Sequence, residues 1–283
     1  MQRDGKSKIL FSDLDGTLLN DNKTISETNR DAIQEMLDRG HYFTICTGRA
    51  VESGRIVAKE LGLNRPGCYM ICYNGAVIYD CASDRIIQQK RLRIEDVIRL
   101  FQAAEKSGIH VQTYQGNDVI ALEHTKELDY YIEKSKMTFK VKSDLISAIE
   151  SEPHKVLLTD IDKTGKLQQF QKENEKWTQN TMNSFFSCEE YLEYCPKDVT
   201  KATGIKVLCD MLNIPIKNTV AVGDERNDIP MIVAAGCGIA MANAYQDVLF
   251  VADAITENDN NNDAIAEVIE KYIFNDAKIG ANA

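Results

Sequence analysis

Patterns typical of buried strands alternate with helical patterns in the first eighty residues. The apolar runs that have the length of a buried strand are KILFS (8–12), HYFTIC (41–46) and CYMICY (68–73). Between the first two runs, Ser26 can cap a helix whose apolar residues recur at helical spacing and which ends at Gly40. A second helical stretch extends to Leu61. This order predicts parallel strands joined by crossover helices, an arrangement whose functional sites gather at the carboxyl ends of the strands.

The pattern changes after about residue 80. Short strand-like pieces, the first of which is RIIQQKRLR (85–93), are interleaved with polar helical segments. We expect these helices near residues 95–107, 126–136 and 166–177. Such a mixture is typical of an α+β unit rather than of a continuing parallel sheet.

The alternation of strands and helices resumes at Lys201 and continues to a last helix, expected from about 264 to 274. We therefore predict an α/β fold with a Rossmann-like parallel-sheet core. The core comprises residues 1–80 and 196–283, and residues 81–195 form a separate α+β domain inserted into it.

Two carboxylates, Asp13 and Asp15, follow the first strand with only Leu14 between them. In an extended chain, side chains two residues apart point the same way, so both carboxylates would face one pocket. At about 4 Å and an effective dielectric constant near 20, their repulsion costs roughly 4 kcal/mol, which a divalent cation would more than reverse. Mg²⁺ is the natural candidate because it prefers oxygen ligands. An Asp-Gly pair between apolar residues also favours a hairpin turn, and this stretch alone leaves both interpretations open.

Residues suited to binding an anion follow the first two strands. Gly16 lets the backbone approach a ligand closely, and the Thr17 hydroxyl can donate to an anion. Thr47 and Gly48 offer a hydroxyl and a free N–H at the start of a helix. The alternative for Thr47 and Gly48 is an ordinary capped helix.

A second group of polar residues accompanies the later strands. Asp224 directly follows a buried strand, and Asn227 and Asp228 lie at the next helix start, where they could hold a metal or simply cap the helix. Lys201 lies at or near a helix start, although most lysines are solvated.

Taken together and in this order, these motifs resemble those of the haloacid dehalogenase-like phosphatases. The matching motifs are DLDGT (13–17), TGR (47–49), NGA (74–76), Lys201 and GDERNDIPM (223–231). They are most similar to the Cof-type branch, subfamily IIB, in which a large C2B-type cap is inserted after the third strand. The resemblance covers the core, residues 8–80 and 196–275, whereas the intervening segment matches only in position, size and strand-helix character.

The resemblance implies a role for each matching residue. Asp13 would attack phosphorus and form an aspartyl-phosphate, and Asp15 would protonate the leaving alcohol and then deprotonate the hydrolytic water. Mg²⁺ would be held by Asp13, the backbone carbonyl of Asp15 and Asp224, with Asp228 supporting from nearby. The residues implied in binding phosphate or substrate are Leu14, Gly16, Thr17, Thr47, Gly48, Arg49, Asn74, Lys201 and Asn227.

The resemblance predicts a Mg²⁺-dependent phosphatase that acts on a small phosphorylated metabolite, most plausibly a sugar phosphate. One alternative keeps the aspartyl-phosphate but passes the phosphoryl group to another alcohol, as phosphomutases do. A second alternative is a receiver-like signalling protein whose Asp13 accepts phosphate, although receivers have no large cap and no reason for a proton shuttle at position 15.

The composition of the chain limits which partners it can bind and where in the cell we expect it. The formal net charge of −10 argues against nucleic acid or an anionic membrane as the partner. No apolar run has the roughly 20 residues of a membrane span, and the first residues lack the apolar core of a signal peptide. We therefore expect a cytoplasmic protein. We also expect it to be a monomer or a weak homodimer. Eight scattered cysteines without a CxxC pair indicate reduced structural thiols rather than disulfides or zinc.

Two other acidic segments imitate functional motifs. A second D-x-D is formed by Asp160 and Asp162, and the run Asp162-Lys163-Thr164-Gly165 resembles the phosphorylation sequence of ion pumps. This copy lies inside the expected insertion, and the chain lacks pump-like membrane spans. Asp259, Asn261, Asp263 and Glu270 fit a calcium loop except that Ala264 replaces the required Gly and Glu270 lies well along the expected helix. We interpret both segments as structural turns.

Overall fold

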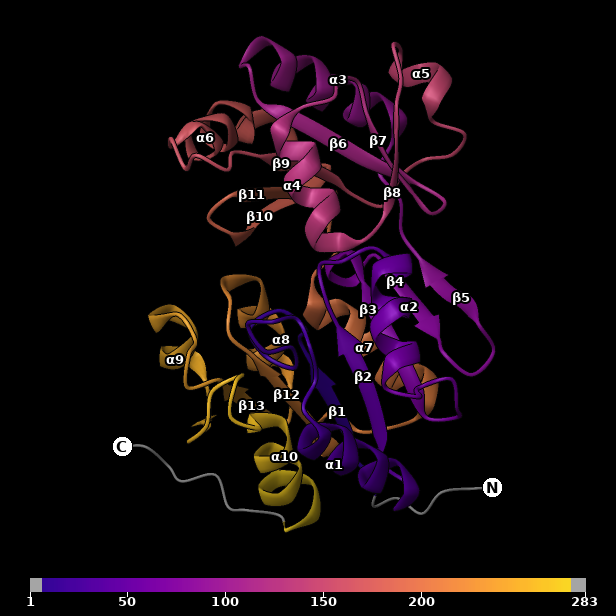
Figure 1. Ribbon diagram of the computed structural model, residues 1–283, viewed down its shortest axis with the longest axis vertical. Helices are drawn as coiled ribbons and strands as arrows, with labels where there is room; N and C mark the ends of the chain where they lie inside the picture. The colour runs from indigo at the N-terminus through magenta and orange to yellow at the C-terminus, as the bar shows by residue number, and fades with distance from the viewer. Residues whose placement is uncertain (1–6, 276–283) are drawn as a thin grey trace.

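The computed structural model describes residues 7–275, whose strands form two sheets (Figure 1). The first sheet has eight strands in the order β14-β13-β12-β1-β2-β3-β4-β5. Neighbours from β14 to β3 are parallel, whereas β4 and β5 are antiparallel additions. The strands are β1 (Ile9–Ser12), β2 (Tyr42–Cys46), β3 (Cys68–Cys72), β4 (Val77–Asp80), β5 (Arg85–Gln89), β12 (Thr219–Gly223), β13 (Cys237–Ala240) and β14 (Ala254–Ile255).

Helices cover both faces of the first sheet (Figure 1). The α-helices are α1 (Glu27–Asp38), α2 (Val51–Glu60), α7 (Lys201–Leu212), α8 (Ile229–Ala234), α9 (Gln246–Val251) and α10 (Ala264–Val268). Shorter helical turns are η1 (Tyr73–Gly75), η2 (Ile216–Asn218), η3 (Arg226–Asp228) and the π-helical η4 (Ile269–Phe274).

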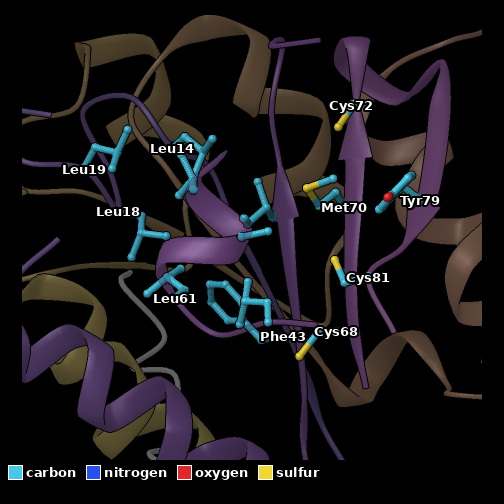
Figure 2. Packing of buried hydrophobic residues seen from close by; sticks show 14 of the residues in the cluster. Leu14, Leu18, Leu19, Phe43, Leu61, Cys68, Met70, Cys72, Tyr79 and Cys81 are labelled. Carbon is cyan, nitrogen blue, oxygen red and sulfur yellow. The ribbon is translucent and has the colours of Figure 1, made fainter. Parts of the chain in front are cut away.

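The central strand β1 is buried on both faces, as its apolar run requires. Ile9 and Phe11 pack in one hydrophobic cluster with α7 and α8, and Leu10 packs in the other with α1 and α10. Figure 2 shows Leu14 among the side chains of this second cluster, which also includes Leu18, Leu19 and Phe43. The predicted α/β fold with a Rossmann-like parallel-sheet core is confirmed.

The second sheet has the order β10-β11-β9-β6-β7-β8 and is antiparallel except for the β7–β8 pair. Its strands are β6 (His110–Gln115), β7 (Asp118–Ala121), β8 (Thr138–Val141), β9 (Val156–Thr159), β10 (Met182–Cys188) and β11 (Tyr191–Pro196). Its helices are α3 (Ile94–Lys106), α4 (Lys126–Ser135), α5 (Leu145–Ala148) and α6 (Lys166–Thr178). In Figure 1 this unit lies above the first sheet, and α4 reaches down towards it.

Two details differ from the sequence pattern. The strand of RIIQQKRLR pairs with β4 in the first sheet as β5, although its position after residue 80 grouped it with the inserted unit. The expected last helix changes from α to π geometry at Ile269. The domain boundaries at residues 81 and 195 stay a prediction. Within residues 7–275, no helix combines the length and apolar character that crossing a membrane requires.

Candidate active site

The segments that follow β1, β2 and β12 meet at one edge of the first sheet, as expected for parallel neighbours. Asp13 continues β1, and its N–H donates to the Val222 carbonyl at 3.1 Å. The chain then leaves the strand direction at Gly16, whose φ is +82°. The site thus begins where the first strand ends, as the sequence predicted.

An acidic cluster lies at this edge. One carboxylate oxygen from each of Asp13, Asp224 and Asp228 lies within 4.8 Å of the others. Burial raises the pKa of Asp13 to about 7, against the lowering effect of Lys201, and the charge of Asp228 raises it further. Burial, followed by the charge of Asp13, also holds the pKa of Asp224 well above its usual range. The cluster therefore has a strong electrostatic preference for an added positive charge.

Lys201 supplies one positive charge to this cluster. Its side chain is fully buried, and Nζ donates to Asp13 Oδ1 at 2.6 Å and to Asp228 Oδ1. Burial alone would lower the pKa of Lys201, but Asp13 and Asp228 hold it above its ordinary value. Lys201 opens α7, whose start is fixed by a capping box between Thr200 and Thr203. The lysine that the sequence left ambiguous is thus a buried ion-pair partner.

The turn after Asp13 packs against Asp224. A Cβ on Gly16 would lie 2.4 Å from Asp224 Oδ2, so only glycine fits between the two segments. Thr17 Oγ1 donates to Asp224 Oδ1 at 2.6 Å. The side chain of Leu14 lies in the hydrophobic core instead, which leaves only its backbone for the predicted contact with phosphate (Figure 2).

Asp15 is engaged by two cations. Arg49 donates to both of its carboxylate oxygens at 2.7 Å, and Lys23 Nζ donates to Oδ1 at 2.8 Å. Burial would raise the pKa of Asp15, but the charges and hydrogen bonds of Arg49 and Lys23 hold it well below its usual range. Asp15 is therefore ionised in this arrangement, and its carboxylate stands apart from the acidic cluster.

The opposite side of the site is formed by amides and a hydroxyl. Thr47 is buried, and its Oγ1 accepts from the Arg49 N–H at 3.1 Å. Asn227 Nδ2 donates to Asn74 Oδ1 at 3.1 Å. Asn74 adopts a left-handed backbone conformation with φ 56°, which asparagine tolerates better than most residues.

A cavity of about 220 Å³ lies over these groups and is lined by both sheets. The part of the first sheet that lines it comprises Asp13, Asp15, Lys23, Thr47, Gly48, Arg49, Glu225 and Asn227. The second sheet and its helices contribute Tyr131, Lys134, Ser135, Lys155, Ser187, Cys188, Glu190, Tyr191 and Glu193. Hydroxyl, amide and charged groups that could contact a phosphate line one side of the cavity, and aromatic and charged side chains line the other.

Comparison with known proteins identifies the family. A family model for haloacid dehalogenase-like hydrolases matches residues 10–269. The chain belongs to the haloacid dehalogenase-like hydrolases. It is 29% identical to the 5-amino-6-(5-phospho-D-ribitylamino)uracil phosphatase YcsE of Bacillus subtilis, over 94% of this chain and 96% of that relative.

Solved structures agree with this assignment. A haloacid dehalogenase-like hydrolase from Bacteroides thetaiotaomicron is 30% identical, with a TM-score of 0.87 over 95% of this chain and all of that one. The sugar phosphatase BT4131 of subclass IIB shares the fold, with a TM-score of 0.78 at 20% identity over 94% of this chain and 99% of its own. The resemblance to Cof-type haloacid dehalogenase-like phosphatases is confirmed, and the chain is an enzyme of this phosphatase class.

The structure of this haloacid dehalogenase-like hydrolase brings most of the predicted site residues together. Those that line the cavity are Asp13, Asp15, Thr47, Gly48, Arg49 and Asn227. Asp224, Asp228, Lys201 and Thr17 are joined to them or to one another by hydrogen bonds, and Asn74 is joined to Asn227. The catalytic, metal-binding and substrate-binding roles of these residues stay predictions.

Sequence reasoning missed Lys23, Glu225 and every cavity-lining residue of the second sheet and its helices. Lys23 lies in an ordinary polar turn, which carries no signal of its own. Glu193 had a readable signal, because it is an acid inside the apolar strand Tyr191–Pro196 and is only 3% exposed. Lys155 likewise directly precedes a buried strand and is 1% exposed. A charge within a buried strand indicates a partner across the fold.

The two segments that resemble a pump phosphorylation sequence and a calcium loop are not part of the acidic cluster of Asp13, Asp224 and Asp228. Asp160 accepts from Thr164 in the turn before α6, and Asp162 pairs with Lys126 at the surface. Asp263 opens α10 in a left-handed conformation. Among residues 7–275, the metal-ligand geometry of three acids or more is found at Asp13, Asp224 and Asp228 and not at these segments.

Proposed function

We propose that the chain is a Mg²⁺-dependent phosphatase that hydrolyses a small phosphorylated metabolite through an aspartyl-phosphate on Asp13. The observation that carries this proposal is the meeting of Asp13, Asp224, Asp228 and Lys201 beside a cavity that Asp13 lines. The family assignment supports it, since the YcsE relative named above is a phosphatase.

The donor set fits Mg²⁺. Its members are carboxylate oxygens, which suit a hard cation that retains several waters. Asp13 and Asp224 would hold the ion together with the backbone carbonyl of Asp15, and Asp228 would support it from nearby. When bound, Mg²⁺ would neutralise charge on the phosphoryl oxygens and on the cluster.

The first chemical step would form a bond between Asp13 and phosphorus while the ester P–O bond breaks. Lys201, Thr47, the Gly48 N–H and Asn227 would hold the transferring phosphoryl group with fixed donors. Asp15 would give a proton to the leaving oxygen. In the second step a water would attack phosphorus, Asp15 would take its proton, and the Asp13–phosphorus bond would break to release inorganic phosphate and regenerate the carboxylate.

The ion pairs of Asp15 affect its two proposed proton transfers differently. The carboxylate form that Arg49 and Lys23 favour is the form that accepts a proton from water. Donating a proton requires a higher pKa, which would follow if an anionic substrate drew Arg49 and Lys23 away from Asp15. We propose that substrate charge itself switches Asp15 between the two states.

The cavity supports a small substrate with a polar leaving group. Its size suits a small molecule rather than a macromolecule. Tyr131 and Tyr191 offer apolar ring surfaces, and Glu190 and Ser187 offer hydrogen-bonding groups. We propose a sugar phosphate or a related polyol phosphate, and the substrate named for the YcsE relative belongs in the test panel. The cytoplasmic location and the monomeric or weakly dimeric state stay predictions.

The test is turnover of p-nitrophenyl phosphate and of a panel of phosphorylated metabolites with Mg²⁺. The Asp13→Asn variant should lose at least about 10³-fold in kcat, because an amide is not a nucleophile. Asp160→Asn, at the corresponding position of the second D-x-D, is the matched control and should retain wild-type turnover.

Three outcomes would contradict the proposal. Retention of about a tenth of the wild-type rate by Asp13→Asn would remove the nucleophile assignment. Phosphosugar isomerisation with little free phosphate would favour a phosphomutase, and stoichiometric labelling without turnover would favour a receiver.

A further inference from the structure

Two buried residues of opposite charge lie where the second sheet faces the active site. Lys155 is 1% exposed and Glu193 is 3% exposed, and Lys155 Nζ lies 3.1 Å from Glu193 Oε2. Glu193 lies in β11, and Lys155 directly precedes β9, the strand that pairs with β11. Replacing a buried ion pair by apolar residues is often neutral or stabilising, so stability alone is a weak reason for this pair.

Each member of the pair also reaches across to the first sheet. Lys155 Nζ donates to the backbone carbonyl of Gly48 at 2.7 Å. Glu193 Oε2 accepts from Asn74 Nδ2 at 2.5 Å. The two contacts join residues 107 and 119 positions apart in the chain, so they form only when the two sheets are docked.

The contacted groups adjoin those that the proposed mechanism uses to hold phosphate. The bond from Lys155 to the Gly48 carbonyl fixes the orientation of the peptide that follows the Thr47-Gly48 anion site. The bond from Asn74 to Glu193 fixes the Asn74 amide, so that its Oδ1 accepts from Asn227 Nδ2 at 3.1 Å. One N–H of the Asn227 amide is thereby engaged, and its second N–H stays free for a phosphoryl oxygen.

We propose that Lys155 and Glu193 are positioning residues that complete the phosphoryl-binding site of the first sheet from the second sheet. The second sheet then has a role beyond contact with the leaving group, because it orients groups that hold the transferring phosphoryl. This inference rests on the proposed phosphatase function. It predicts that the pair affects every substrate, including one without sugar hydroxyls.

The experiment uses p-nitrophenyl phosphate, whose leaving group offers no sugar hydroxyls to the second sheet. Glu193→Gln and Glu193→Leu form a matched pair, since both leave Lys155 with the same unpaired buried charge. Glutamine keeps an acceptor for Asn74, and leucine does not. We expect both variants to lose thermal midpoint, and Glu193→Gln to keep a kcat at least about tenfold higher than Glu193→Leu.

The double variant Lys155→Met with Glu193→Leu separates stability from positioning. It removes both charges, so its thermal midpoint should recover towards wild type. Its kcat should stay at least about tenfold below wild type, and competitive inhibition by inorganic phosphate should weaken by a similar factor, because the Gly48 and Asn74 contacts are still missing.

The outcomes distinguish failure of the phosphatase proposal from failure of the positioning role. Absence of turnover in the wild-type protein would overturn the phosphatase proposal itself. With wild-type turnover present, equal kcat values for Glu193→Gln and Glu193→Leu would overturn the positioning role. So would a double variant that regains wild-type kcat and phosphate inhibition together with its thermal midpoint.

Discussion

Asp228 shows how individual residues hold the site rigid. Its Oδ2 accepts the N–H groups of Asp224 and Glu225, at 3.1 and 3.0 Å, while Oδ1 accepts from Lys201. A Cβ on Gly223 would lie 2.5 Å from the Asp228 Cγ, so glycine is required where the strand passes this carboxylate. Asp228 therefore serves as a scaffold for its neighbours as well as a member of the acidic cluster.

Substitution of Asp15 tests the proton shuttle. Asp15→Asn should lower kcat/KM by about 10²–10⁴-fold for a sugar phosphate, because the poor leaving group needs a proton, and by much less for p-nitrophenyl phosphate. Steady-state kinetics with both substrates measures the difference. Lys23→Met is the comparison, since it removes one ion pair of Asp15 but keeps the carboxylate, and it should cost the sugar phosphate far less than Asp15→Asn does. Equal losses for the two substrates in Asp15→Asn would argue against the acid role.

Whether a single site residue could be recognised from the sequence depended on where it lies in the fold. Asp13 and Asp224 could be recognised because a carboxylate directly after a buried strand is unusual and its neighbourhood follows from the parallel sheet. Lys155 and Glu193 could not be placed, because their partners belong to another sheet whose docking no local pattern specifies. The sequence left open whether Lys201 is solvated or part of the site. It could not decide, because the burial of a lysine depends on contacts with distant segments.

At the scale of elements, the turn η1 and the helix α7 fit against each other through glycine. Gly75 has φ +112°, and a Cβ there would lie 2.2 Å from the Thr200 carbonyl oxygen. Thr200 caps α7 and directly precedes Lys201. The close approach of the two backbones therefore sets where the buried lysine enters the site.

Gly75→Ala tests this packing. It should destabilise the fold by at least about 2 kcal/mol and lower kcat, because the left-handed backbone is strained and the Thr200 carbonyl must shift. Gly40→Ala is the matched control, since Gly40 has φ +87° with no atom within 4 Å of an added Cβ. It should cost only the backbone strain of roughly 1–2 kcal/mol and leave kcat unchanged. Thermal unfolding and turnover measure both effects, and indistinguishable results for the two variants would contradict the account.

The helices α3, α4 and α6 of the second unit were predicted to within two residues at each end, because apolar periodicity is a local signal. The four-residue helix α5 was not predicted. The strand β5 was harder to place. It is mostly exposed at the edge of the first sheet, so it has no buried face that could indicate which sheet it joins. The change to π geometry at Ile269 had no sequence signal that we recognised.

At the scale of the whole molecule, the sequence predicted two structural units but not how they meet. The cavity depends on that meeting, since its walls come from both sheets. Tyr73 of η1 stacks on His154 beside β9, with ring centroids 5.1 Å apart, and Ser53 of α2 donates to the Ser135 carbonyl at the end of α4. These contacts surround the Lys155–Glu193 pair and hold the two units together over the active site.

The central claim is that Asp13 accepts the phosphoryl group in this cavity, and trapping that adduct tests it most directly. The Asp15→Asn variant, mixed with p-nitrophenyl phosphate and Mg²⁺ and quenched in acid, should accumulate the intermediate because its hydrolysis lacks a base. Peptide mass spectrometry should find one phosphoryl group on Asp13 and none in the variant that also carries Asp13→Asn. Turnover without an adduct on Asp13, or an adduct on a different residue, would contradict the account.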